Sequence, residues 1–509
     1  MTPRAAARWG PFAAVLGLWS LTRLLLLLLA LDPDAYSGAI MGDVILYAAK
    51  VERMFQGELP YRDVAIEYPP GSVPFTLLPA LLAGTGEHYK LAFGLTMLTV
   101  DAIGLGIATR LGQLLESGGG WWAGWRVALA YLAGTFLAGP LLFTRFDIVP
   151  GVCVMLACLL AIQKRPGLAA AALGYGAAAK LFPAVLAPLL VMGLVPAFGW
   201  VRSFVRTVPG FLAGFALTVV PALLFSASGT IRSVLLYHAS RGVQIESLWA
   251  NGIDLLHLVA GLPVREVYQF GAFDLGSSLS GPAKSLSGVA TLLAIAGAAW
   301  LTWRRADLRA GQSGGHLEAA DWVLVMGLGV LAFMLPTRVL SPQYLIWLGV
   351  LAGTVAIPRA RGAWVLWALA GALTQLVFPF HYDRLRLFQP EGIWLLTARN
   401  AALAGIAVVL VRALLETRGR AAGGARRPPS RTLARDGGSC PGPDRDPVDN
   451  PAHLSHQQAK LDVWLVDGTV ISDVALCRER RFARWQRRCY RLRAHTPAPN
   501  LGAVRDQRR

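Results

Sequence analysis

The chain has 509 residues, of which 55% are hydrophobic and only 15% are charged, and its formal net charge is +18. This apolar fraction exceeds that of soluble domains, so the composition excludes a soluble enzyme or binding module and predicts an all-α polytopic membrane protein. The positive charge does not indicate nucleic-acid binding. It lies in a C-terminal stretch and in short segments between apolar runs. Membrane proteins show this pattern because their short cytoplasmic loops concentrate Lys and Arg.

The sequence predicts about 12 transmembrane helices, since a helix needs roughly 20 apolar residues to cross about 30 Å of hydrocarbon. The first is expected to be a retained anchor, because Asp32 and Asp34 follow it where a signal peptide would carry small residues. Placing the Lys- and Arg-rich loops in the cytoplasm puts the N-terminus inside. The expected spans lie near residues 11–31, 90–110, 123–143, 146–163, 167–181, 182–199, 207–226, 286–303, 320–336, 342–357, 362–380 and 391–413.

The apolar segment from Ser72 to Gly86 is an exception to this pattern. It has about 15 residues and contains two prolines, so it is too short to cross the bilayer comfortably. We expect an interfacial or re-entrant helix that is buried against protein, because exposed irregular backbone is not tolerated in the hydrocarbon region.

The loop that follows the first span is the one clearly anionic segment of this basic chain. Short cytoplasmic loops concentrate Lys and Arg, so an acidic loop beside the membrane belongs on the other side. The sequence therefore predicts a long first extracytoplasmic loop that carries the chemistry. Its carboxylates are Asp32, Asp34, Asp43, Glu52, Glu58, Asp63 and Glu67, against the cations Lys50, Arg53 and Arg62.

The same topology places the other polar clusters on the outer face. A structural protein has no reason to gather its polar groups on one side of the bilayer, whereas a site for lipid-linked substrates does. These clusters lie at residues 144–147 and 180–183, in a long loop expected over residues 227–284, and at residues 337–344 and 381–384.

The pattern changes near residue 415. We expect a transmembrane catalytic domain over residues 1–414 and a basic, largely disordered cytoplasmic tail over residues 415–509. Within the tail, residues 461–476 could form a strand pair. Residues 478–493 could form a basic helix on anionic lipid, or simply a solvated run of charge. The five cysteines indicate neither a disulfide framework nor a metal site.

Several short motifs, in this order along the chain, resemble those of glycosyltransferase family 87. The resemblance runs from about residue 10 to residue 413 and rests on the order of the motifs rather than on any one of them. It implies a GT-C-like bundle and a polyprenyl-phosphate-mannose-dependent alpha-mannosyltransferase of the actinobacterial type. The motifs are Gly42-Asp43 with Tyr47, residues 57–63, Glu67-Tyr68-Pro69-Pro70-Gly71, Arg145-Phe146-Asp147, Lys180-Leu181-Phe182-Pro183, residues 241–247 and Ser341-Pro342-Gln343-Tyr344.

Asp43 is the candidate catalytic residue. In GT-C enzymes a carboxylate of the first extracytoplasmic loop is catalytic, and the resemblance assigns that role to Asp43. The chemistry agrees, because a phosphodiester leaves as a stable anion without a general acid, whereas the attacking hydroxyl benefits from a carboxylate base. The alternative is a helix N-cap, since Asp43 precedes the amphipathic pattern from Val44 to Phe55.

Cations are needed to stabilise the leaving phosphate. Lys180 ends an otherwise uncharged apolar span, where a lysine either snorkels or meets an anion. Arg338 precedes a helix entrance and suits bidentate phosphate binding. Arg145 and Asp147 are further candidates, although the two could simply pair with each other.

Other polar residues of the outer face are candidates for contacts with a sugar or an acceptor, with ordinary loop polarity as the alternative. Glu67 could instead pair with Arg62 or Arg145. Asp101 lies near mid-membrane, and there we expect a structural pair with a neighbouring helix. The remaining candidates are Tyr68, Arg241, Gln244, Glu246, Ser341, Gln343 and His381.

Together these features predict an enzyme of the cell membrane with an extracytoplasmic site. The expected reaction moves a mannosyl residue from polyprenyl-phosphate mannose to a glycolipid or lipoglycan acceptor. The expected partners are these two substrates and membrane lipids, with no nucleic acid, no metal and no cofactor beyond the lipid donor. The alternatives are another polyprenyl-phosphate sugar, such as a pentose, or a transporter or flippase of lipid-linked sugars, which would show inverted repeats and ionisable groups in a mid-membrane cavity.

Overall fold

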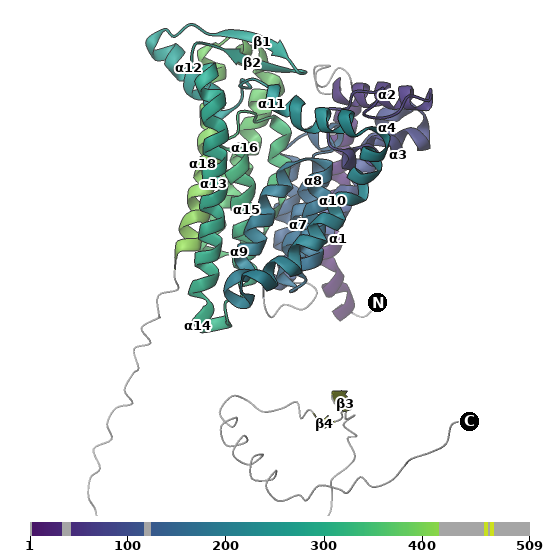
Figure 1. Cartoon of the computed structure of the whole chain (residues 1–509), viewed down its shortest axis with the longest axis vertical. Helices are drawn as coiled ribbons and strands as arrows, with labels where there is room; N and C mark the ends of the chain where they lie inside the picture. The colour runs from purple at the N-terminus through teal and green to yellow at the C-terminus, as the bar shows by residue number, and fades with distance from the viewer. Residues whose placement is uncertain (1–2, 33–41, 117–123, 417–462, 467–468, 473–509) are drawn as a thin grey trace, which may run out of the picture. The chain divides into compact units, whose positions relative to one another are not determined.

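The computed structural model describes residues 3–32, 42–116, 124–416, 463–466 and 469–472 (Figure 1). The chain divides into two compact units, Met1–Gly424 and Ala425–Arg509. In the second unit the strands β3 (Val463–Val466) and β4 (Thr469–Ser472) pair antiparallel. The predicted strand pair is therefore confirmed, and the basic helix expected at residues 478–493 lies outside the described residues.

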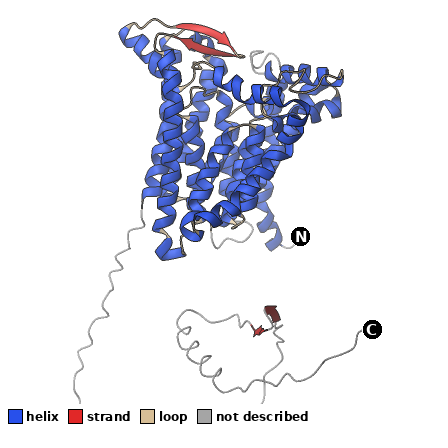
Figure 2. Cartoon of the chain, viewed as in Figure 1, coloured by secondary structure: helices blue, strands red, loops and turns tan. Residues whose placement is uncertain are grey.

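The first unit is helical apart from one hairpin, as Figure 2 shows. The hairpin joins β1 (Arg265–Gln269) and β2 (Ala272–Gly276), which pair antiparallel with Gln269 opposite Ala272. In chain order the helices are α1 (Pro3–Leu31), α2 (Gly42–Phe55), η2 (Pro70–Ser72), α3 (Val73–Ala83), α4 (His88–Leu115), α5 (Trp125–Phe136), α6 (Leu141–Thr144), α7 (Ile148–Ile162), α8 (Pro166–Ala179), η4 (Phe182–Val185), α9 (Leu186–Phe198), α10 (Trp200–Ile231), η5 (Arg232–Leu236), α11 (Tyr237–Ser240), α12 (Leu248–Ala260), α13 (Ser280–Leu308), α14 (Ala310–Ser313), α15 (Ala319–Met334), η6 (Pro342–Ala356), η7 (Pro358–Ala360), α16 (Arg361–Gln375), η8 (Leu376–Phe380), α17 (Tyr382–Arg386) and α18 (Pro390–Leu415).

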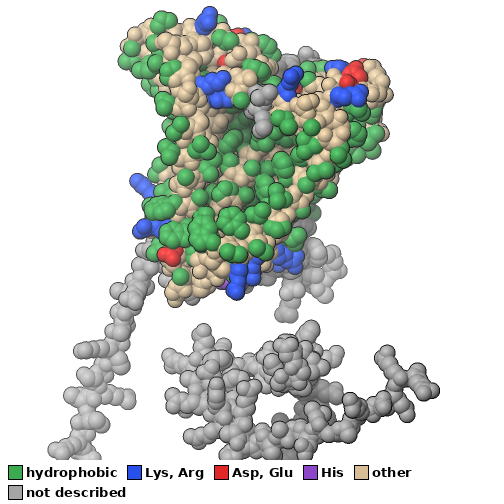
Figure 3. All heavy atoms as spheres, in the orientation of Figure 1, with side chains coloured by type: hydrophobic (Ala, Val, Ile, Leu, Met, Phe, Trp, Pro, Cys, Tyr) green, Lys and Arg blue, Asp and Glu red, His purple; other side chains and the backbone are tan. Residues whose placement is uncertain are grey.

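Six helices in the described part of the chain are long and apolar enough to cross a membrane. In Figure 3, hydrophobic side chains cover the middle of the visible face, while Lys and Arg gather towards its two ends. The helical class and the membrane character are thus confirmed. The number of 12 spans stays a prediction, because six further apolar helices have only 10–17 residues. The long candidates are Ala13–Leu31, His88–Leu115, Trp200–Val234, Ser280–Leu308, Pro358–Phe380 and Pro390–Leu415.

Two of the shorter apolar helices differ in how far they reach. The 11 residues of α3 extend only about 17 Å at 1.5 Å per residue, so α3 cannot cross the bilayer, as expected for the segment from Ser72 to Gly86. The 15 residues of η6 form a 3₁₀-helix, which rises about 2 Å per residue and therefore extends about 30 Å. Its residues Pro342 and Tyr344–Thr354 are buried inside the bundle.

Close backbone contact fixes α8 against α10. A Cβ atom on Gly210 would lie 2.1 Å from the carbonyl oxygen of Gly167, and one on Gly214 would lie 2.1 Å from that of Ala171. Small residues allow this approach, which is how membrane helices gain packing energy without a hydrophobic driving force between them. The contact fixes the position of α8, at whose C-terminal end Lys180 lies.

The segment from residue 227 to residue 284, which the sequence predicted as a long loop, is mostly regular structure. Helix α10 continues to Ile231, and α11, α12 and the β1–β2 hairpin follow before α13 begins at Ser280. The hairpin was missed because its strands are short and only partly buried.

Asp101 of α4 is buried in the bundle and fully partnered. Arg23 of α1 forms an ion pair with it at 2.8 Å, and the Trp19 indole and the Tyr131 hydroxyl donate to the same carboxylate at 2.7 and 2.9 Å. The expected structural pair with a neighbouring helix is therefore confirmed. A buried charge of this kind is stable only while its partner is present.

We expect Arg23→Met to lower the free energy of unfolding by about 3 to 5 kcal/mol, because it leaves the Asp101 carboxylate buried without its cation. The double variant Arg23→Met/Asp101→Leu should recover much of this loss. Thermal unfolding of the purified protein in detergent measures both effects, with Arg110→Met, an exposed site on α4, as the control. A single variant as stable as the unmodified protein would contradict the structural role of the pair.

Candidate functional site

Asp43 lies in the first turn of α2, where a carboxylate is favoured by the helix dipole. The amphipathic pattern of this helix buries Val44, Tyr47 and Val51, which share one face at helical spacing, and leaves Asp43 at the edge of that face. The Arg145 Nε atom lies 2.6 Å from Asp43 Oδ2. The Asp43 side chain is 30% exposed, so one side of the carboxylate remains accessible.

Asp147 connects three parts of the bundle. Its Oδ1 atom lies 2.7 Å from Lys180 Nζ at the end of α8 and accepts a hydrogen bond of 2.8 Å from the Trp347 indole in η6. Asp147 directly precedes α7, and Lys180 directly follows α8, so both charges lie at helix ends whose dipoles favour them. The sequence prediction that Arg145 and Asp147 could pair with each other is wrong, because each pairs with a different residue.

Four aromatic rings surround the Lys180 ammonium group at 5.3 to 5.6 Å. Tyr344 and Trp347 stack at 3.7 Å, because residues three apart lie directly above one another in a 3₁₀-helix. Ring faces attract cations, most strongly where water is excluded. The rings belong to Tyr68, Phe146, Tyr344 and Trp347.

The segment that carries Glu67 and Tyr68 is docked onto the end of α8. A Cβ atom on Gly71 would lie 2.6 Å from the backbone carbon of Ala178, so only glycine permits this contact. Glu67 pairs with Lys50 of α2. The alternative that Glu67 pairs with Arg62 or Arg145 is therefore wrong, and Arg62 pairs instead with its neighbour Asp63.

The segment Gly242–Ile245 is held between the hairpin and the segment before η6. The Leu275 amide donates to the Val243 carbonyl at 2.8 Å, and the Gln244 amide donates to the Arg338 carbonyl at 3.0 Å. The buried Asp274 carboxylate of β2 accepts from the Gly242 amide at 3.1 Å. This network brings Arg241 and Arg338, which are 97 residues apart in the sequence, to one cavity.

The cavity has a volume of about 450 Å³. Lys180, Arg241 and Arg338 supply its charge, and Thr337, Ser287 and Thr291 supply neutral polar groups. The rest of its wall is apolar. Those residues are Tyr68, Pro69, Leu181, Phe182, Gly288, Leu292, Phe333, Val339, Tyr344 and Trp347.

The positive charge of this cavity is only partly compensated. Lys180 is paired with Asp147, whereas the Arg241 Nε atom has no hydrogen-bond partner and no carboxylate lies within ion-pair distance of Arg241 among the described residues. Burial lowers the pKa of Arg338 below its usual value, and the nearby Arg241 charge lowers it further. The cavity is therefore suited to an anion with an apolar attachment.

Other predicted residues lie away from the cavity. The Ser341 hydroxyl donates to the Gln244 side chain at 3.2 Å, and the buried Glu246 lies beside Arg399 of α18. His381 contacts the Leu376 carbonyl through Nδ1 at 2.9 Å. None of these, nor Gln343, lines the cavity. These residues therefore contribute no side chain to the lining of the cavity.

Sequence reasoning missed the Trp347 indole and the Thr337 hydroxyl. Trp347 lies in an apolar run that reads as an ordinary span, and only the 3₁₀ geometry turns it towards Asp147. Thr337 is adjacent to Arg338, so the polar cluster at residues 337–344 was the available signal.

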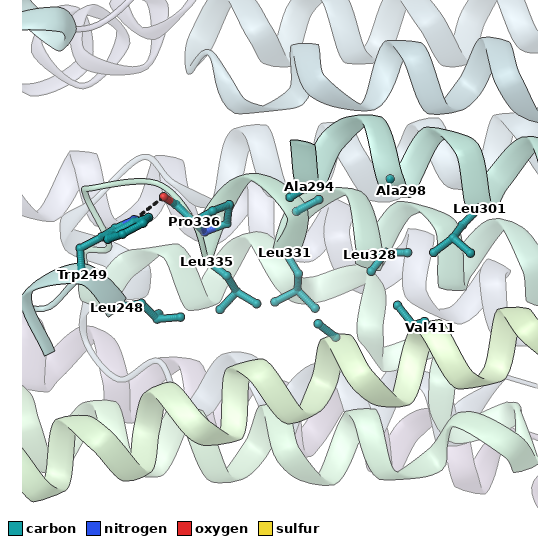
Figure 4. Close-up of a pocket in the computed structure, with 13 residues that line it drawn as sticks. Leu248, Trp249, Ala294, Ala298, Leu301, Leu328, Leu331, Leu335, Pro336 and Val411 are labelled. Atoms are coloured by element: carbon teal, nitrogen blue, oxygen red, sulfur yellow. Dashed lines mark hydrogen bonds between the residues drawn. The ribbon is translucent and has the colours of Figure 1, made fainter. Parts of the chain in front are cut away.

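A larger groove of about 540 Å³ lies between α13, α15 and α18 (Figure 4). Leu301, Leu328 and Leu331 point into it, and at one end the Trp249 indole donates to the Pro336 carbonyl at 2.7 Å. No charged side chain lines this groove. It therefore offers no group for catalysis, and the smaller cavity is the better candidate.

Two further carboxylates, Glu246 and Asp254, are buried. Burial raises the pKa of Glu246 to about 7, although the Arg399 charge opposes the shift. Burial also raises the pKa of Asp254 to about 7, and neither carboxylate oxygen of Asp254 has a hydrogen-bond partner among the described residues. Because the folded protein binds these protons more tightly than the unfolded chain, both groups favour the fold at low pH.

We expect Asp254→Asn to stabilise the protein above pH 7 by roughly 1 to 3 kcal/mol and to have little effect near pH 4. The stability that the protonated Asp254 carboxyl contributes is complete below its unfolded pKa of about 4 and is lost as the pH rises through 7. Thermal unfolding at pH 5 and pH 8 measures the difference. Asp307→Asn, at an exposed position, is the control, and a variant with an unchanged pH dependence would refute the assignment.

The family model of glycosyltransferase family 87 matches residues 66–317, just under half of the chain. The match indicates a glycosyltransferase. It includes Glu67, Arg145, Lys180 and Arg241, whereas Asp43 precedes it and the segment around Arg338 follows it. No curated protein matches the chain.

Proposed function

We propose that the protein transfers a mannosyl residue from polyprenyl-phosphate mannose to a glycolipid or lipoglycan acceptor on the extracytoplasmic face. The observation that carries this proposal is the cavity in which Lys180, Arg241 and Arg338 face an otherwise largely apolar wall. Arginine guanidinium groups suit phosphate, and the apolar wall suits the first units of a hydrocarbon chain. A soluble sugar nucleotide also carries phosphate, but it has no hydrocarbon chain and would not need the apolar wall.

The proposed base is Asp43. The acceptor oxygen forms a bond to the anomeric carbon while the bond from that carbon to the phosphate oxygen breaks. The electron pair leaves with polyprenyl phosphate, and the acceptor proton moves to the Asp43 carboxylate. Attack on the face opposite the phosphate inverts the configuration at the anomeric carbon.

Asp43 and the cavity are connected through a short chain of contacts. Arg145 pairs with Asp43, and the adjacent Phe146 packs edge to face on Tyr68 at 4.8 Å, which lines the cavity. Tyr47, one turn after Asp43, also packs edge to face on Tyr68 at 6.1 Å. The base and the phosphate-binding cations therefore belong to one site, as a sugar placed between them requires.

The distribution of cations supports the proposed orientation. Basic residues lie at the bundle end opposite the site, in the connection between α7 and α8 and at or next to the ends of α10, α13, η7 and α16. They are Lys164, Arg165, Arg202, Arg206, Arg304, Arg305, Arg309, Arg359 and Arg361. Short cytoplasmic loops concentrate these residues, so the site end belongs outside. The choice of mannose rather than a pentose as the donor sugar rests on the resemblance of the motifs and not on the shape of the cavity.

The flippase alternative is less well supported. It requires ionisable groups that are available in a mid-membrane cavity. Asp101 is the group that the sequence offered for this role, and its carboxylate is already partnered by Arg23, Trp19 and Tyr131.

Asp43→Asn should reduce mannosyl transfer by roughly 10²- to 10⁴-fold, because it removes the base without changing the size of the side chain. Membranes supplied with radiolabelled polyprenyl-phosphate mannose provide the assay. Asp63→Asn, in the same loop but exposed and paired with Arg62, should retain activity. Undiminished transfer by Asp43→Asn would refute the role of Asp43.

Arg241→Gln should raise the KM for the lipid donor by roughly 10- to 100-fold, because a charge-assisted contact to phosphate is worth about 1.5 to 3 kcal/mol. Donor-dependent initial rates measure the change. Arg384→Gln, at an exposed site paired with Glu391, is the matched control. Equal KM values for both variants would show that Arg241 does not bind the phosphate.

A further inference from the structure

The turn of the β1–β2 hairpin contains an aromatic residue where turn geometry disfavours one. Phe270 and Gly271 both have positive φ, at 51° and 68°. A two-residue turn of this kind requires the left-handed conformation at both positions, and Asn-Gly is the preferred pair. A phenylalanine at the first position is strained, and such strain is retained where the surroundings or the function require the side chain.

The Phe270 ring packs on a residue that faces the site. Tyr237 of α11 contacts Phe270 edge to face at 5.3 Å, and its hydroxyl donates to the Phe270 carbonyl at 2.8 Å. The Arg338 guanidinium, which lines the phosphate-binding cavity, donates to the carbonyl of Ala239 in the same short helix at 3.1 Å. The two rings therefore lie on elements next to the phosphate-binding cavity.

These rings do not belong to the hydrophobic core. Phe270 is 38% exposed and Tyr268, two residues earlier, is 67% exposed. Figure 1 shows that the hairpin projects from the α12 side towards α2, beyond the ends of the spanning helices. A bilayer anchor would be expected along the spanning helices, whereas this hairpin lies beyond their ends.

We propose that Tyr237 and Phe270 form a platform that binds the glycan part of the acceptor. This proposal rests on the proposed transferase function. The apolar face of a pyranose ring can pack on such exposed aromatic side chains, while its hydroxyl groups remain available to water and to neighbouring polar groups. The platform lies where an acceptor would approach Asp43 from outside. The lipid phosphate binds separately, through Arg241 and Arg338.

Phe270→Asn tests this proposal, because asparagine is the residue that the turn prefers. The variant should fold at least as stably as the unmodified protein, and we expect the KM for octyl dimannoside as acceptor to rise roughly tenfold. The KM for the lipid donor should not change. Val259→Asn, which replaces an 84% exposed apolar residue of α12, is the matched control and should leave both KM values unchanged.

Saturation-transfer NMR of octyl dimannoside on the purified protein separates this inference from the proposed function, because it needs no turnover. The platform is supported if the sugar protons receive signal from the unmodified protein and lose that signal in Phe270→Asn. This result would support it even if the unmodified protein transfers no mannose. Equal sugar signals and equal acceptor KM values in the variant and the unmodified protein would overturn it. Signal transfer confined to the octyl protons would overturn it as well.

Discussion

The ion pair between Asp147 and Lys180 is the interaction on which the rest of the site depends. It connects the start of α7 with the end of α8, and through the Trp347 indole it also binds η6. The Asp147 side chain is only 2% exposed, so without these donors its charge would be unstable in this environment. One buried carboxylate therefore holds the ends of α7, α8 and η6 together at the site.

The charges of the site fall into two groups with different consequences. Asp43 with Arg145, and Asp147 with Lys180, form compensated pairs that can stay folded in a low-dielectric setting. Arg241 and Arg338 repel each other. Burial lowers the pKa of Arg338 most, the repulsion lowers it further, and the nearby Asp274 carboxylate opposes the shift. The backbone contacts of residues 242–245 with β2 and with the Arg338 carbonyl hold this arrangement in place. An anion between the two arginines would offset this repulsion, and that is the role of the phosphate in the proposed function.

The sequence was sufficient for features that depend on local chemistry. Hydropathy predicted the helices. The segment from Ser72 to Gly86 was predicted to be too short to cross the bilayer because of its length and its prolines. A partner for Asp101 was predicted because a buried charge without one is unstable. Pairings between distant residues were not predictable. Arg145 and Asp147 are two residues apart, yet they bind Asp43 of α2 and Lys180 directly after α8, partners that are distant in the sequence and meet them only in the folded bundle.

The hairpin shows why part of the site escapes a reading by hydropathy. Its strands are short, and they contribute to the site through backbone bonds and through Asp274 rather than through a recognisable motif. A Cβ atom on Gly242 would lie 2.5 Å from the Asp274 carboxylate, so glycine at position 242 allows the carboxylate to reach the backbone amide. That contact holds the backbone next to Arg241. The motif at residues 241–247 made Arg241 a candidate, but composition and periodicity carry no sign of its place beside Arg338, because that place depends on a glycine contact with a strand that is distant in the sequence.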